Sequence, residues 1–93
     1  MAASDILTFE GEHHLVLVDY YSKYIEVTRL EDLTSQETIE ALKEDFSRHG
    51  IPEKLVTDCG GQYTRKEFEN FAKSYNFEHF LVSPKHHVDW RSF

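Results

Sequence analysis

The sequence predicts an α/β domain built on a mixed five-stranded sheet with flanking helices. Three short apolar stretches near the N-terminus have the spacing of an antiparallel meander. Two helix patterns follow, and each leads into a further strand, as in a crossover between parallel strands. The 93 residues fit one domain, and 40% hydrophobic and 14% aromatic residues are typical of a chain that folds around a core.

The first three strands are expected at 5–9, 13–20 and 24–30. Residues 13–20 are apolar and rich in β-branched side chains, and residues 24–30 alternate between apolar and polar side chains. Residues 1–4 are expected to form an N-terminal extension ahead of the domain, which itself is expected to span residues 5–85.

The first helix is expected at 35–49. Thr34 and Glu37 fit a capping box, and Gly50 suits the C-terminal cap. Between these caps an apolar stripe has helical spacing: Ile39, Leu42 and Phe46.

The second helix is expected at 65–75, between strands at 54–58 and 77–82. Thr64 and Glu67 form another capping-box pattern, and Asn76 suits a left-handed cap. This helix also has an apolar stripe: Phe68, Phe71, Ala72 and Tyr75. Residues 86–93 show no clear period and are interpreted as a divergent tail.

Two acids stand out in this arrangement. Asp58 ends the strand at 54–58 and precedes Gly60 and Gly61, and open α/β sheets place ligand sites where a strand ends in such a turn. The predicted element order, β-β-β-α-β-α-β, is that of a ribonuclease H-like domain. In that fold the first strand lies in mid-sheet with the strand at 54–58 parallel beside it. Asp5, assigned to the end of that first strand, would then lie close enough to Asp58 to share an ion.

The sequence resembles the catalytic core of retroviral integrases and of gypsy-type LTR-retrotransposon integrases, including host genes derived from such elements. The resemblance covers about residues 5–85 and depends on a combination of matched stretches: 5–11, 15–26, 49–52, 57–63, 68, 71–72 and 83–85.

This resemblance implies metal-dependent transfer of polynucleotide strands, with Mg²⁺ or Mn²⁺ held by two aspartates and a glutamate. Asp5 matches the family's first acid and Asp58 its second, so both are the expected catalytic and metal-binding residues. Gln62 and Lys85 are expected to make weak contacts with nucleic acid. DNA is the partner that the family implies, together with a possible homodimer.

The sequence departs from the family's pattern in several places. The family's glutamate would fall just beyond Phe93, so the third acid is absent from this chain. The segment that leads to it reads His86-His87-Val88-Asp89-Trp90-Arg91, unlike the family's usual motif, and Cys59 replaces the usual asparagine. The family's zinc-binding and basic DNA-binding domains and its remaining core helices are also missing. We therefore expect a fold that is incomplete at its C-terminus and inactive as this fragment.

Composition limits the partners of the chain. A formal net charge of −7 argues against simple electrostatic binding to nucleic acid, although bound divalent ions would offset part of it. No apolar run approaches the ~18 residues of a membrane span, and no secretory signal is visible. The single cysteine fits a reducing compartment, so an intracellular location is expected, with the nucleus as a candidate. No small-molecule substrate is implied.

Other interpretations stay open beside the leading one. Asp19 is a rival first acid, but its position suggests a structural role, such as a bond to Ser22. The adjacent histidine pairs lack the usual spacing of zinc ligands. The chain could instead be a working strand transferase or endonuclease completed by another acid, such as Asp89, or by another chain. It could also be a protein-interaction module derived from a transposable element.

Overall fold

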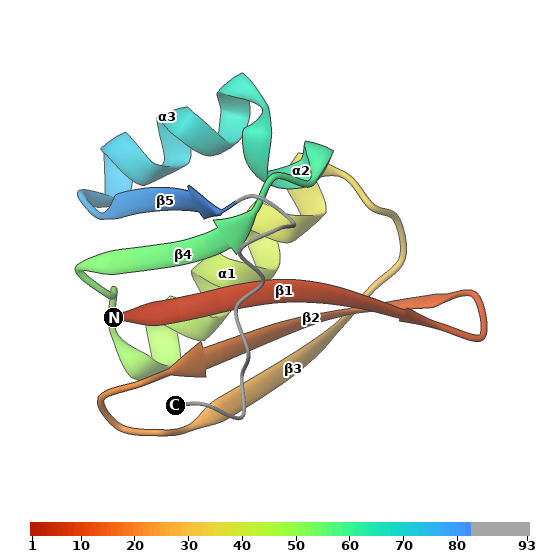
Figure 1. Ribbon diagram of the computed structural model, residues 1–93, viewed down its shortest axis with the longest axis horizontal. Coiled ribbons are helices and arrows are strands. Elements are labelled where there is room, and N and C mark those ends of the chain that lie inside the picture. Colours follow the sequence, from red (N-terminus) through yellow and green to blue (C-terminus); the bar gives the residue numbers. More distant parts are fainter. Residues whose placement is uncertain (83–93) are drawn as a thin grey trace.

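The structure, a computed structural model, describes residues 1–82. Its elements follow in the order β1 (Ala2–Phe9), β2 (Glu12–Asp19), β3 (Ile25–Leu30), α1 (Ser35–His49), β4 (Lys54–Asp58), α2 (Gly61–Thr64), α3 (Lys66–Tyr75) and β5 (Glu78–Val82). The strands form one sheet in the order β3-β2-β1-β4-β5 (Figure 1). β1 is antiparallel to β2 and parallel to β4, and β4 is parallel to β5. The predicted mixed five-stranded sheet is confirmed, and so is the pairing of the first strand with the strand at 54–58.

β1 begins three residues earlier than predicted. Ala2, Ala3 and Ser4, expected to precede the domain, are buried in the sheet. Their short side chains have little intrinsic preference for strands, so the sequence gives no local sign of one. Long-range pairing decides the conformation, since Ala2 pairs with Asp19 on one side and with Leu55 on the other.

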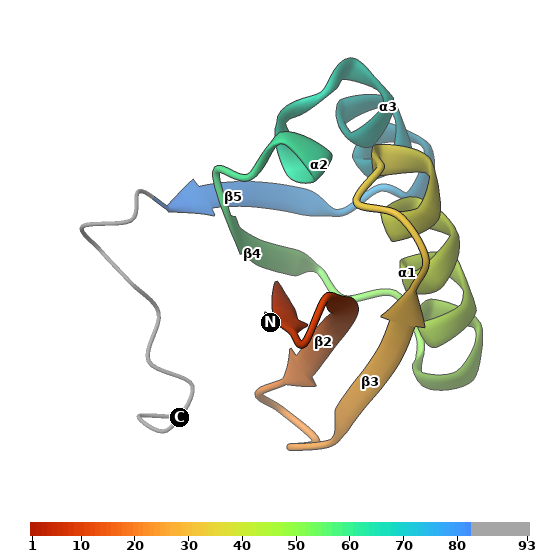
Figure 2. The same ribbon diagram turned by 90° about the vertical axis from the view of Figure 1, so that its right-hand side faces the viewer.

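The helices lie on one face of the sheet (Figure 2). Between the two layers lies a core of buried apolar side chains from the strands and from both predicted stripes: Ala2, Leu15, Leu17, Leu30, Ile39, Ala41, Leu42, Phe46, Leu55, Tyr63, Phe68, Phe71, Ala72 and Phe77. Residues that alternate with these along the strands must therefore point to the opposite face.

The capping box of α1 is half confirmed. Thr34 Oγ1 accepts a hydrogen bond of 3.1 Å from the Glu37 N–H, as predicted. The Glu37 carboxylate does not return to the N-cap backbone but accepts from the N–H groups of Glu31 and Asp32. The helix ends as expected, with the Gly50 N–H donating to the Phe46 carbonyl at a φ of 91°.

The predicted second helix is two helices, and the capping box at Thr64 is wrong. Thr64 is the last residue of α2, and its N–H donates to the Gly60 carbonyl. The chain breaks at Arg65, which is extended and caps α3 without a side-chain hydrogen bond. A short helix therefore begins at the two glycines, and Thr64 lies at the end of that helix instead of before the next one. The left-handed cap at Asn76 is confirmed, with φ of 60° and ψ of 46°.

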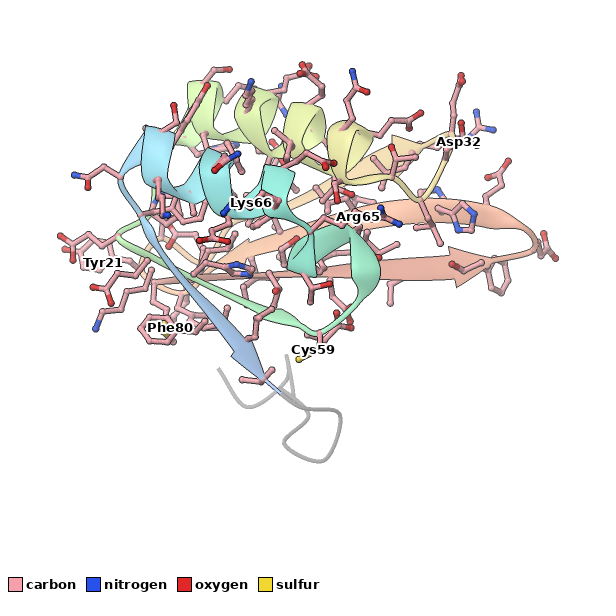
Figure 3. All side chains as sticks on the ribbon, turned by 90° about the horizontal axis from the view of Figure 1, so that it is seen from above. Tyr21, Asp32, Cys59, Arg65, Lys66 and Phe80 are labelled. Carbon is pink, nitrogen blue, oxygen red and sulfur yellow. The ribbon has the colours of Figure 1, made fainter. Side chains whose placement is uncertain are left out.

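No helix of residues 1–82 covers the second face of the sheet, which we call the open face. It carries large exposed apolar side chains, among them Phe9 at 71% exposure and Ile25 at 65%. Figure 3 shows Phe80 of β5 pointing away from the helical layer. Within the described part of the chain, no helix is long and apolar enough to cross a membrane.

Candidate metal centre

Asp5 lies in the middle of β1 and points to the open face. The prediction that it ends its strand is wrong, because β1 runs from Ala2 to Phe9. Its neighbours Ser4 and Ile6 turn toward the helical side, where Ser4 is buried and Ile6 packs against the core. The Asp5 side chain is half-buried, and its Oδ1 accepts a hydrogen bond of 2.8 Å from the Ile6 N–H.

Asp58 ends β4, as predicted, and points to the same face. Leu55 and Thr57 are buried on the helical side, so Val56 and Asp58 face the other way. The exposed Asp58 carboxylate accepts a hydrogen bond of 2.9 Å on Oδ1 from the Gly60 N–H. This bond closes a tight turn of the kind aspartate favours and fixes the carboxylate at the start of the glycine turn.

The strand register brings the two acids to the same level of the sheet. β1 and β4 pair with Ala2 opposite Leu55 and Ala3 opposite Val56. Continued by two residues, the same parallel register would set Asp5 level with Asp58. Neighbouring strands are about 4.8 Å apart, which is within the span of carboxylates that share one ion.

Gln62 lies beside Asp58 because Gly60 leaves room for it. A β-carbon at Gly60 would lie 2.6 Å from Gln62 Nε2 and 3.1 Å from Asp58 Oδ1. The Gln62 carboxamide therefore occupies the space above this glycine, next to the second acid. The other expected nucleic-acid contact, Lys85, lies outside the described residues, as does Asp89.

Behind the acids, on the helical side of the sheet, lie two hydrogen bonds that sequence reasoning missed. Ser4 Oγ and the Tyr63 hydroxyl are 2.8 Å apart, and both residues are buried. Thr57 Oγ1 lies 2.7 Å from His79 Nε2. Burial is the main cause that raises the pKa of the Tyr63 hydroxyl, and the nearby charges of Asp5 and Asp58 raise it further, while the bond to Ser4 opposes the shift. Burial also lowers the pKa of His79. The polar groups behind the acids therefore stay neutral near pH 7.

The donor set suits one hard cation. Mg²⁺ prefers oxygen ligands and is commonly held by one or two carboxylates while it keeps several waters. Residues 1–82 contain no group of three or more acid, histidine or cysteine side chains placed to hold a metal. The rival acid Asp19 is engaged elsewhere, since it accepts hydrogen bonds from Ser22 Oγ at 2.7 Å and from the Tyr21 N–H, which confirms its predicted structural role. Cys59 is exposed on the loop after β4 (Figure 3), where its Sγ lies 3.5 Å from the Val82 carbonyl oxygen.

This sheet order, with helices on one face and two acids on adjacent parallel strands, defines a ribonuclease H-like domain. The integrase core domain model matches residues 3–87. The chain therefore belongs to the integrase core domain family, as the resemblance in its sequence implied.

Relatives and solved structures agree with this assignment. The chain is 39% identical over 69 residues to an uncharacterized protein of Caenorhabditis elegans, and 40% identical over 75 residues to the Gag-Pro-Pol polyprotein of bovine leukemia virus. These matches cover 74% and 81% of this chain, but 5% of each relative.

Two solved structures of viral proteins have the same fold. The catalytic core domain of HTLV-2 integrase, in complex with magnesium and in a dimeric form, has a TM-score of 0.83 and 27% identity, covering 90% of this chain and 60% of that one. A chain of the simian T-cell lymphotropic virus intasome, in complex with the PP2A regulatory subunit B56 gamma, has a TM-score of 0.83 and 28% identity, covering 89% of this chain and 31% of that one. The described sheet thus corresponds to part of a longer protein in each case.

Proposed function

We propose that this chain is an integrase-type core that binds a single Mg²⁺ or Mn²⁺ ion between Asp5 and Asp58 and contacts DNA weakly. The observation that carries the proposal is the parallel pairing of β1 with β4, whose register, continued to the acids, would set the two carboxylates level on one face. The magnesium complex of the similar HTLV-2 core supports the choice of ion.

The two carboxylates would hold the ion, and the surrounding backbone would orient them. The N–H groups of Ile6 and Gly60 each donate to a carboxylate oxygen, which orients the side chains of Asp5 and Asp58. When bound, Mg²⁺ supplies Lewis acidity toward phosphate oxygens. Gln62, whose carboxamide lies beside Asp58, would donate hydrogen bonds to a phosphate at this site.

Weak binding to DNA follows from the charge. With a net charge of −7 the chain repels a phosphate backbone, and an ion at Asp5 and Asp58 relieves that repulsion at one point of the surface. We propose Gln62 and Lys85 as contacts to the backbone, and a nuclear location in keeping with a DNA partner. A homodimer is part of the same proposal, and it is supported by the dimeric form of the HTLV-2 core.

We further propose that these 93 residues do not cleave DNA or transfer strands by themselves. Two carboxylates bind one ion, whereas the two-ion arrangement that stabilises both the attacking and the leaving oxygen needs a further ligand. Each 1.36 kcal/mol of lost stabilisation slows a reaction about tenfold, so the loss of a whole ion is severe. An acid outside the described residues, such as Asp89, or a partner chain is the alternative source of that ligand.

A second candidate function is protein binding without catalysis, and the open face favours it. Exposed apolar surface of this kind commonly marks sites of protein interaction. Leu7, Ile25, Val27 and Phe80 are all more than 40% exposed on that face. A module derived from a transposable element could bind a protein through this surface, with no metal ion at Asp5 and Asp58.

Metal binding is the decisive test. We expect Mn²⁺, titrated into isotope-labelled protein, to broaden the amide signals of Gly60 and Gly61 by paramagnetic relaxation. Asp58→Asn should abolish the effect because it removes a charged ligand, whereas Asp19→Asn, the matched control at the end of β2, should leave it unchanged. Equal broadening in the wild type and Asp58→Asn would refute the proposed site.

Cleavage is tested separately with a DNA duplex that carries a recessed 3′ end. We expect no metal-dependent product from the wild type with Mg²⁺ or Mn²⁺, and weak binding of the duplex that strengthens when the ion is added. Cleavage by the wild type that is lost in Asp58→Asn would show that another ligand completes the site. Normal metal binding with no affinity for DNA would favour the protein-interaction alternative.

A further inference from the structure

The residue before each acid is buried on the helical side, where its hydroxyl is hydrogen-bonded to the side chain of another residue. Ser4, which precedes Asp5, is paired with Tyr63 at 2.8 Å. Thr57, which precedes Asp58, is paired with His79 at 2.7 Å. The two bonds differ in what they join: the Thr57 bond links β4 to β5, whereas the Ser4 bond reaches from β1 to α2.

The Ser4–Tyr63 bond therefore connects the two acid-bearing segments of the chain. Ser4 and Asp5 are adjacent on β1, so a hydrogen bond to one limits the movement of the other. Tyr63 lies in α2, which begins directly after the turn that Asp58 closes. β1 pairs with β4 at Ala2 and Ala3, before the level of the acids. Beyond that level, the Ser4–Tyr63 hydrogen bond links the two segments that carry the acids.

Tyr63 is well suited to hold such a link. Its side chain is 1% exposed, and its ring packs edge-on against Phe68 with 5.4 Å between the ring centroids. A tyrosine hydroxyl is protonated at neutral pH, and burial raises the pKa of Tyr63 further, so this hydroxyl can donate or accept toward Ser4. Because the ring is packed this tightly, a shift of α2 would move the Tyr63 hydroxyl and, through its hydrogen bond to Ser4, would move β1.

We propose that the Ser4–Tyr63 hydrogen bond is a positioning element that sets the spacing of Asp5 and Asp58 and thereby the affinity of the site for a divalent cation. This inference rests on the proposed function, because it assumes that the two acids share an ion. Neither Ser4 nor Tyr63 contacts the ion in this proposal. Partners that orient metal ligands typically change metal affinity by 10–100-fold when they are removed.

The test uses single and double variants of the full chain. Tyr63→Phe or Ser4→Ala removes one partner and leaves the other buried without a hydrogen bond, so each single variant should lose stability. The double variant Ser4→Ala/Tyr63→Phe removes both polar groups, so its melting temperature should recover toward the wild-type value. Metal affinity should not recover with it. From Mn²⁺ relaxation at Gly60 and Gly61 we expect the double variant to bind about tenfold more weakly than the wild type.

Tyr75→Phe is the matched control, since Tyr75 packs on Phe71 and makes no hydrogen bond through its hydroxyl within residues 1–82. Tyr75→Phe should change neither the melting temperature nor the affinity for Mn²⁺. A double variant that is stable and binds Mn²⁺ as tightly as the wild type would overturn the inference and leave the proposed function standing. If the wild type shows no Mn²⁺ effect at all, the proposed metal site fails, and the inference fails with it.

Discussion

The Asp45 carboxylate and the Arg48 guanidinium form a 2.8 Å ion pair in which only the arginine reaches solvent. The Asp45 side chain is 0% exposed, compared with 44% for Arg48. Its second oxygen, Oδ2, has no hydrogen-bond partner within residues 1–82. Burial is the main cause that raises the pKa of Asp45 to about 6, and Glu26 adds to the shift while Arg48 opposes it. This residue of α1 therefore titrates close to neutrality.

Asp45 should make the stability of the chain depend on pH. Its folded pKa of about 6 lies above the ordinary value of 3.8, so the protonated form contributes stability that is complete below about pH 4 and is lost as the pH rises through about 6. Asp45→Asn should therefore stabilise the protein at pH 7.5 by about 1–3 kcal/mol, and have little effect at pH 4. Urea unfolding of both proteins at the two pH values measures the difference.

Asp32→Asn is the control for this prediction, because Asp32 is exposed in the loop before α1. It should shift stability by no more than about 0.5 kcal/mol at either pH. A difference between Asp45→Asn and the wild type that is the same at pH 4 and pH 7.5 would contradict the assignment of the titration to Asp45.

The two capping-box threonines should differ in their effect on stability. Thr34 accepts a hydrogen bond from the Glu37 N–H at the start of α1, so Thr34→Ala should cost about 1 kcal/mol. Thr64 ends α2 and caps nothing, so Thr64→Ala should fall within about 0.5 kcal/mol of the wild type. Urea unfolding at pH 7 measures both. A cost at Thr64 as large as that at Thr34 would mean that the pattern acts as a cap after all.

The contrast between these threonines shows where local patterns stop being informative. The same residue spacing is found before both helices. At the second one, however, Gly60 caps the short helix α2, and Thr64 is the last residue of that helix. The start of β1 was missed for a related reason, because Ala2 and Ala3 become strand through pairing with residues far along the chain. The sheet itself was predictable, since a meander followed by two helical crossovers leaves few ways to order five strands.

The candidate site was predictable at its acids and not behind them. Asp58 precedes a glycine turn, and the resemblance to integrases identifies Asp5 as a match for the family's first acid. The partner of Ser4 is Tyr63, 59 positions along the chain, and no spacing rule connects two such residues. The one signal in the sequence is alternation: if Asp5 and Asp58 face one way, then Ser4 and Thr57 face the core and need polar partners there.

The open face should cause self-association. Ile25 and Val27 are 65% and 58% exposed on the edge strand β3, and both point away from the helices. We expect sedimentation velocity to show a weight-average mass that rises with concentration. The double variant Ile25→Thr/Val27→Thr should reduce this rise, because threonine keeps the β-branched shape and adds a hydroxyl. Arg29→Thr, at an exposed position on the same face of β3, should not reduce it, and a wild type that stays monomeric throughout would contradict the prediction.

Gly60 and Gly61 should differ in their effect on the metal site, although they are neighbours in one turn. A β-carbon at Gly60 would meet Gln62 Nε2 at 2.6 Å and Asp58 Oδ1 at 3.1 Å, whereas one at Gly61 would meet no atom within 4 Å. Neither glycine has a positive φ, so backbone strain does not enter the comparison. Gly60→Ala should displace the Gln62 carboxamide and crowd Asp58, which should weaken Mn²⁺ binding several-fold. Paramagnetic relaxation at the backbone amides of β4 measures that affinity. Gly61→Ala should bind Mn²⁺ as the wild type does. Its free energy of unfolding should rise by about 0.4–1 kcal/mol, because alanine restricts the unfolded chain. Equal Mn²⁺ affinity in the two variants would show that the space over Gly60 has no part in holding Asp58.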